Sequence, residues 1–157
     1  MAAIFSNEMT RIYLMSYWIT AFASVCQTEA LPLVAMSHLG GLGLDEKAIG
    51  VIGTLSGLIF CVGQYFVFTQ AMMLLGFVQS IRLGAFWGTV PTILIPFSLY
   101  MSGAVQLVYL SFISGTLMIC NSVYLGRNTI GANRSVESSQ RAAMNGLSGL
   151  GTSIGRP

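Results

Sequence analysis

The sequence predicts an all-α membrane protein, a polytopic bundle of transmembrane helices, from three observations. The chain is 54% hydrophobic and only 8% charged, whereas soluble domains average about 25% charged residues. Its long uncharged stretches are continuously apolar, without the period-two alternation of a membrane barrel. Lipid cannot satisfy open backbone groups, so continuous apolar spans of this kind have to be helical.

The first two spans are separated by a polar turn. About 20 apolar residues cross a bilayer as a helix, and residues 12–38 provide the first such segment. The turn-rich sequence "GGLGLDEK", Gly40–Lys47, then interrupts the apolar sequence. A second span is expected over residues 49–70, and a short connector then leads to Arg82. Within this second span, Gly53 and Gly57 have the small-xxx-small spacing that favours close packing of one helix on another.

The next uncharged stretch, residues 83–126, is too long for one crossing. The sequence "YMSGAV", Tyr100–Val105, divides it into spans over residues 82–101 and 104–126. The polar segment Arg127–Arg141 is predicted to be the longest loop. A further apolar segment, residues 142–157, is too short to cross. We therefore expect four complete spans, the start of a fifth and no soluble domain.

Basic residues predict how the helices are oriented, because cytoplasmic loops are enriched in Lys and Arg. With four complete spans, five arginines fall on one side of the membrane and Lys47 falls on the other. These arginines are Arg11, Arg82, Arg127, Arg134 and Arg141. The bias predicts a cytoplasmic N-terminus and a cytoplasmic Arg127–Arg141 loop, in a cellular membrane that the sequence does not identify.

Several classes of function lack support in the sequence. The three cysteines, Cys26, Cys61 and Cys120, are far apart in apolar sequence, which suggests neither a disulfide framework nor a zinc site. No HExxH, GxSxG or phosphate-binding GxxxxGK[ST] motif occurs. Basic tracts with interleaved aromatic residues, the usual mark of nucleic-acid binding, are also missing. We therefore expect no enzyme activity, cofactor, metal or nucleic-acid partner.

Three segments in order resemble parts of a known transporter family. They are "EALPLVAMSHLGGLGLDEKAIGVIGTLSGLIFCVGQ" (Glu29–Gln64), "LLGFVQSIRLGAF" (Leu74–Phe86) and "SVESSQRAAMNGLSGLGTSIGRP" (Ser135–Pro157). The first resembles the seventh and eighth spans of major facilitator superfamily transporters. The second is similar to the short cytoplasmic connector before the ninth span, and the third to the connector and start of the eleventh span. The zinc-induced-facilitator-like and fungal multidrug-type group is the most similar.

The resemblance implies a fold of twelve helices, in which two six-helix halves rock about a central site. This chain would then be a partial C-terminal transmembrane half-domain. Its partners would be the lipid bilayer, a small-molecule solute, in some members a proton, and the missing N-terminal half or other partner helices.

Glu29 is the first candidate for a functional residue. An acid within a span is costly and usually faces a cavity or a partner. Loss of water favours the protonated form of a carboxylate, so Glu29 is a candidate for proton coupling or cation contact. The alternative is a hydrated Glu29 near the outer headgroups. Pro32 removes one backbone donor and could bend this end of the helix as a gate.

Other polar residues divide into two groups. Gln64, Asn121 and Tyr124 are candidates for lining a solute cavity, with hydrogen bonding between helices as the alternative. Gly76 and Arg82 belong to the predicted connector, and Arg141, Asn145 and Gly146 to the start of the last segment. These five residues are candidates for an inner gate, although a basic residue at a helix end also serves as an ordinary membrane anchor.

Two functions follow from these observations. The first is a secondary active transporter, or a fragment of one, that moves a small solute by alternating access, with proton coupling implied only by the resemblance. The second is a truncated, non-transporting membrane protein that associates with a partner membrane protein or regulates it.

Overall fold

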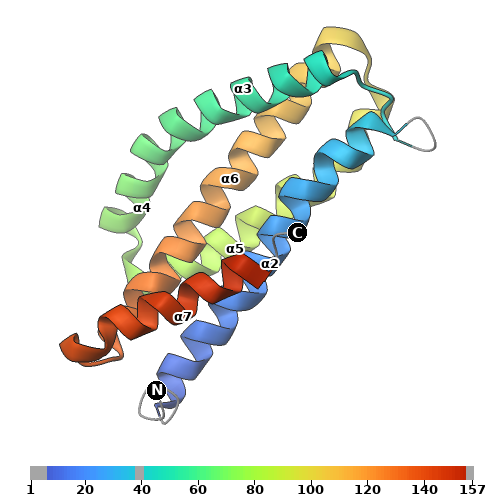
Figure 1. The fold of residues 1–157 in the computed structure, drawn as a ribbon. Coiled ribbons are helices and arrows are strands. Elements are labelled where there is room, and N and C mark those ends of the chain that lie inside the picture. The colour runs from blue at the N-terminus through green and yellow to red at the C-terminus, as the bar shows by residue number, and fades with distance from the viewer. Residues whose placement is uncertain (1–6, 38–40, 155–157) are drawn as a thin grey trace. The chain divides into compact units, whose positions relative to one another are not determined.

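A computed structural model describes residues 7–37 and 41–154, and this part of the chain is helical without any β-strand. Figure 1 shows the order of the helices along the chain. They are α2 (Glu8–Met36), α3 (Glu46–Gly63), α4 (Thr69–Leu74), α5 (Gly76–Leu94), α6 (Gly103–Arg134) and α7 (Arg141–Ile154). A π-helical turn, η1 (Gln64–Phe68), joins α3 to α4, and 3-10 turns form η2 (Ile95–Tyr100) and η3 (Ser138–Gln140).

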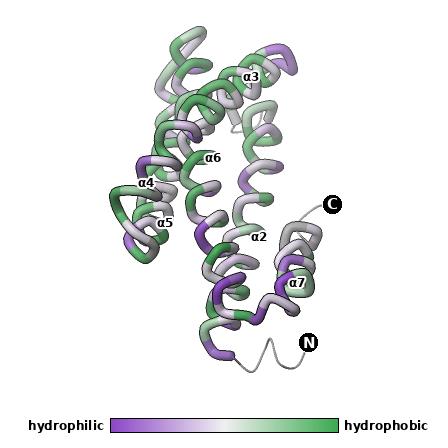
Figure 2. The backbone as a smooth tube through the Cα atoms, turned by 90° about the vertical axis from the view of Figure 1, so that its left-hand side faces the viewer, coloured by the Kyte–Doolittle hydropathy of each residue, from purple (hydrophilic) through white to green (hydrophobic). Residues whose placement is uncertain are grey.

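The predicted all-α fold is confirmed. Within the described residues, four helices are long and apolar enough to cross a membrane: Glu8–Met36, Glu46–Val67, Val78–Tyr100 and Gly103–Arg134. The protein is therefore an integral, multi-pass membrane protein. In Figure 2, α3 is predominantly hydrophobic, whereas α7 carries paler and more hydrophilic residues.

Capping side chains start the first two spans earlier than the apolar pattern predicts. Asn7 Oδ1 accepts a hydrogen bond from the backbone N–H of Met9 at 3.0 Å, so α2 begins at Glu8 rather than at residue 12. Asp45 accepts from the backbone N–H of Ala48 at 2.9 Å, and α3 begins at Glu46 rather than at residue 49. In both cases a short polar side chain satisfies an N–H that has no partner within the helix. Residues 38 and 155–157 of the predicted spans lie outside the described residues.

The predicted long loop Arg127–Arg141 is wrong, because α6 continues to Arg134. Arg127, Asn128 and Ala132 are buried, and packing of this face keeps the polar segment helical. Only residues 135–137 and the short η3 turn separate α6 from α7.

The connector before Arg82 is also shorter than predicted. α5 already begins at Gly76, whose positive φ of 67° makes the turn after α4. Glycine adopts this left-handed conformation without the steric cost that a Cβ atom brings. Arg82 therefore lies within α5, and its side chain is exposed. The break predicted at Tyr100–Val105 falls at residues 101–102, where Gly103 has a φ of 60°.

Contacts divide the chain into two compact units, and each is described by itself. Unit 1 comprises Met1–Glu29 and Tyr124–Pro157. Its hydrophobic core consists of Leu14 on α2, Ala132 on α6, and Met144 and Leu147 on α7. Trp18 Nε1 donates a hydrogen bond to the backbone carbonyl of Leu147 at 2.9 Å. The end of α6 is fixed similarly, since Asn7 Nδ2 donates to the carbonyl of Ser135 at 3.1 Å.

Unit 2 comprises Ala30–Val123, and small residues bring α3 and α6 together within it. Ser56 Oγ donates to the carbonyl of Ser111 at 3.2 Å, directly across the helix pair. One turn further along α6, a Cβ atom placed on Gly115 would lie 2.7 Å from Cγ2 of Ile59. In lipid there is no hydrophobic driving force for two helices to associate. Close approach of α3 and α6 stabilises the pair through van der Waals contact instead.

The predicted contact at Gly53 and Gly57 is not formed in the described structure. Apart from the neighbouring backbone of α3 itself, no described atom lies within 4 Å of a Cβ atom placed on either residue. The packed residue is Ser56, which lies about 100° around α3 from Gly57. Within the described chain, α3 therefore packs on α6 through the face of Ser56 and not through that of Gly53 and Gly57.

Side chains of α6 satisfy the backbone where α5 changes into η2. Pro91 lies inside α5 and Pro96 lies near the start of η2, and each lacks the N–H that an α-helix needs. The carbonyl of Leu94 accepts from the Tyr109 hydroxyl at 2.9 Å, and that of Ser98 accepts from Gln106 Nε2 at 3.0 Å. These bonds permit an irregular helix end within an apolar segment.

Tyr109→Phe should lower the free energy of unfolding by about 1 kcal/mol, because the carbonyl of Leu94 loses its side-chain donor. The matched control is Tyr100→Phe, since the Tyr100 side chain is 88% exposed and the change should leave stability within about 0.5 kcal/mol. Denaturation of the purified protein in mixed detergent micelles, followed by circular dichroism, measures both values. Equal losses in the two variants would refute this role of Tyr109.

Candidate functional site

A buried polar face on the last three turns of α6 is the first candidate site, and it lies within unit 1. Tyr124, Arg127 and Asn128 occur at positions i, i+3 and i+4, which place their side chains on one side of the helix. Gly131 and Ala132 continue the same side. We call Tyr124, Arg127, Asn128, Gly131 and Ala132 the α6 polar face.

Tyr124 connects this face to α2. Its hydroxyl and Ser16 Oγ lie 2.6 Å apart, a short hydrogen bond in which either atom can donate. The side chains of Thr20 and Asn128 also contact the Tyr124 hydroxyl. Four polar side chains from two membrane-length helices therefore meet at one point.

Arg127 and Asn128 are the most unusual residues of this face, because both are buried in an apolar protein. Arg127 is 5% exposed and Asn128 is 2% exposed. Nδ2 of Asn128 has no hydrogen-bond partner among the described residues. An amide buried without a partner is costly, which makes this face a candidate site.

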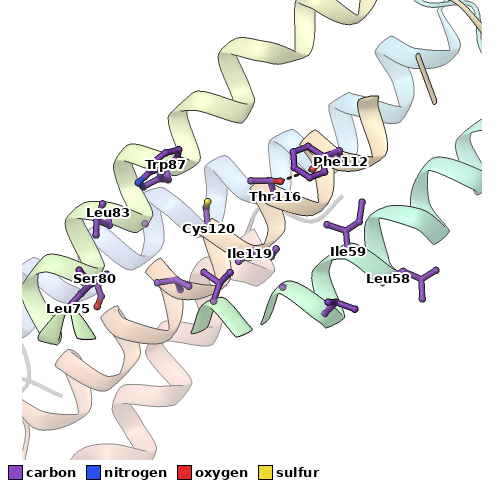
Figure 3. Close-up of a pocket in the computed structure, with 15 residues that line it drawn as sticks. Leu58, Ile59, Leu75, Ser80, Leu83, Trp87, Phe112, Thr116, Ile119 and Cys120 are labelled. Atoms are coloured by element: carbon purple, nitrogen blue, oxygen red, sulfur yellow. Dashed lines mark hydrogen bonds between the residues drawn. The ribbon is translucent and has the colours of Figure 1, made fainter. Parts of the chain in front are cut away.

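The second candidate site is a cavity of about 770 Å³ in unit 2. Figure 3 shows its wall: Trp87, Leu83 and Ser80 come from α5, Thr116, Ile119 and Cys120 from α6, and Leu58 and Ile59 from α3. None of the described residues that line the cavity is charged. Its volume lies within the range of about 300–1,000 Å³ that is typical of small-molecule sites.

The four predicted cavity residues do not gather at one place. Tyr124 belongs to the α6 polar face. Asn121 lies one turn earlier on α6 and is half-buried. Gln64 begins the π-helical turn η1, and its Oε1 is buried without a hydrogen-bond partner in the described structure. Glu29 lies within α2, and its side chain is exposed.

The predicted gate residues are spread over several elements. Pro32 lies inside α2, which continues through it to Met36. Gly76 makes the turn into α5, as described above. Arg141 begins α7, and its Nε donates to the carbonyl of Asn133 at 3.2 Å. Asn145 and Gly146 lie on the exposed side of α7.

Sequence reasoning missed the buried members of both sites. The polar composition predicts a loop at Arg127 and Asn128, although the spacing of Tyr124, Asn128 and Ala132 by four residues is a helical signal. The cavity residues Trp87 and Thr116 gave no such signal, because ordinary lipid-facing helices contain the same residue types. Only the meeting of three helices distinguishes them.

Metal chemistry has no candidate centre in the described part of the chain, where no three His, Cys, Asp or Glu side chains gather. Comparison with known proteins finds no match to this chain among protein families, curated proteins or solved structures.

The pair Ser16–Tyr124 should show an interaction free energy of about 1 kcal/mol in a double-mutant cycle built from Ser16→Ala and Tyr124→Phe. The control cycle replaces Ser16→Ala by Thr28→Val. Thr28 lies on the same helix but bonds to its own backbone, at the carbonyl of Ser24, so its coupling to Tyr124 should be near zero. Unfolding in mixed micelles provides the free energies. A coupling no larger than the control would contradict the bond between α2 and α6.

Proposed function

We propose that this chain is a secondary active transporter, or part of one, that moves a small solute by alternating access. The α6 polar face carries the proposal. Charged and amide side chains are expensive inside a membrane protein, and those that occur there usually mark a path for ions or solutes. Arg127 and Asn128 are buried on a helix that is long enough to span the bilayer, which fits such a path.

Interrupted helices give a second line of support. α3 continues through the π-helical turn η1, and α5 changes into the 3-10 turn η2. Irregular backbone at membrane depth is tolerated where it is buried in protein or lines a cavity, and broken helices form the central sites of many transporters. Gln64, with its buried Oε1, begins the first of these irregular turns.

The order of the three quoted segments supports a transporter of the major facilitator type. In that case the chain corresponds to most of the second six-helix half, and the first half would supply the opposite wall of the central site. The basic residues favour a cytoplasmic N-terminus. With Arg127 buried, this orientation depends on the exposed Arg11, Arg82, Arg134 and Arg141.

A second candidate function is association with a partner membrane protein without transport. It is favoured by the open face of α3 at Gly50, Gly53 and Gly57, where no described atom outside the neighbouring backbone of α3 lies within 4 Å of an added Cβ atom. Small residues of this kind allow the close approach of another helix. The two candidates differ in whether the chain itself moves a solute.

Transport is tested by counterflow into vesicles that contain the purified full chain. Four probes cover the classes of charge: neutral N-phenyl-1-naphthylamine, the cation tetraphenylphosphonium, the anion benzoate and the zwitterion phenylalanine. At least one should show saturable counterflow. We expect Arg127→Gln to lower the initial rate of counterflow of that probe by about tenfold or more. A tenfold decrease corresponds to a rise of about 1.4 kcal/mol in the activation free energy of transport.

The matched control is Arg134→Gln, which removes the same charge from an exposed position at the end of the same helix and should change the rate less than twofold. Tyr124→Phe is a milder change at the same site and should also slow counterflow. Equal rates in Arg127→Gln and Arg134→Gln would exclude the α6 polar face from transport. A folded chain that moves none of the four probes would contradict transport of these probes by this chain alone and favour the second candidate.

Proton coupling through Glu29 makes a separate prediction. If the Glu29 carboxyl carries the proton, Glu29→Gln should abolish the dependence of counterflow on external pH, because an amide does not titrate in this range. Glu137→Gln, at an exposed position between α6 and α7, should leave that dependence intact. Rates measured from pH 5 to 8 provide the comparison. An unchanged pH profile in Glu29→Gln would remove Glu29 from the mechanism.

A further inference from the structure

We propose that the cavity in unit 2 binds one small, uncharged aromatic molecule. This proposal concerns binding alone and is independent of whether the α6 polar face transports a solute. It follows from the chemistry of the cavity wall, from its size, and from the aromatic side chains that border it.

The polar groups of the wall are already satisfied. Ser80 Oγ donates to the carbonyl of Gly76 at 2.6 Å, and Thr116 Oγ1 donates to the carbonyl of Phe112 at 2.8 Å. Each bond is made one turn back along the same helix. The wall therefore presents mainly carbon and sulfur atoms to a ligand. A charged or strongly polar ligand would lose its hydration there and find few hydrogen-bond partners in return, and this loss is costly. An uncharged, weakly polar ligand avoids this cost.

The size of the cavity suits a small molecule. The cavity measures about 770 Å³, within the range of about 300–1,000 Å³ that is typical of small-molecule sites. Gly63 and Gly84 form part of its lining, and a Cβ atom placed on Gly63 would collide with the side chain of Ile119. The space between these helices is therefore narrow and suits a small molecule.

Two aromatic rings suit an aromatic ligand. Trp87 on α5 and Phe112 on α6 both line the cavity (Figure 3), and each keeps more than half of its surface exposed. The protein therefore covers both rings only in part. Offset or edge-to-face contact with a ligand ring adds stabilisation beyond the burial of apolar area.

Energy transfer from Trp87 to N-phenyl-1-naphthylamine tests the proposal in the purified full chain. The chain has two tryptophans, so Trp87→Phe identifies the part of the signal that comes from the cavity. We expect a saturable signal at one ligand per chain. Neutral naphthalene should compete for the site, whereas naphthalene sulfonate should not, because its charge would have to be desolvated.

Thr116→Phe fills the cavity with a ring and should weaken binding by about tenfold, a change worth about 1.4 kcal/mol. The matched control is Thr54→Phe on α3. The Thr54 hydroxyl also bonds one turn back, to the carbonyl of Gly50 at 2.9 Å, but its side chain is exposed and does not line the cavity. Affinity in this variant should stay within twofold of the unaltered protein.

Three results would overturn the proposal. A signal that rises linearly with ligand, equally in both threonine variants, would mean that the ligand only partitions into lipid or detergent. Equal competition by the sulfonate would contradict selection of uncharged ligands. A phospholipid retained at one per chain in native mass spectrometry, and lost in Thr116→Phe but not in Thr54→Phe, would assign the cavity to a lipid acyl chain instead.

Discussion

The need to satisfy every polar group without water governs this protein. In hydrocarbon an unpaired N–H, C=O or hydroxyl costs several kcal/mol, and the helices meet this need largely from within. The hydroxyls of Thr54, Ser80, Thr89 and Thr116 all bond to the carbonyl four residues earlier. A chain that contains many hydroxyl groups can therefore still present an apolar surface to lipid.

The same need explains where the helices depart from regular geometry. At the junction of α5 and η2, the two prolines disturb the ladder of backbone bonds, and Tyr109 and Gln106 supply donors to carbonyls there. These donors come from α6, which is packed within the same unit. The irregular turn is thus a feature of tertiary structure, because α5 alone could not complete its own hydrogen bonds.

α6 contributes to both units with different chemistry. Its first part, up to Val123, lies in unit 2 and lines an apolar cavity through Thr116 and Cys120. Its last turns, from Tyr124 onward, carry buried Arg127 and Asn128 in unit 1. A neutral ligand suits the first part and a polar or charged one suits the second. The two sites therefore support separate proposals, and the failure of one leaves the other standing.

The sequence by itself determined the all-α class, the four membrane-length helices and the break before Gly103, because these depend on local composition and on the conformational freedom of glycine. Tertiary structure decided the rest. Arg127 and Asn128 are polar enough to be assigned to a loop, yet both are helical and buried within unit 1. Ser56 rather than Gly57 meets α6, since which face of a helix is packed depends on its neighbours. A cavity formed by three helices exists only where they meet, so no single segment could encode it.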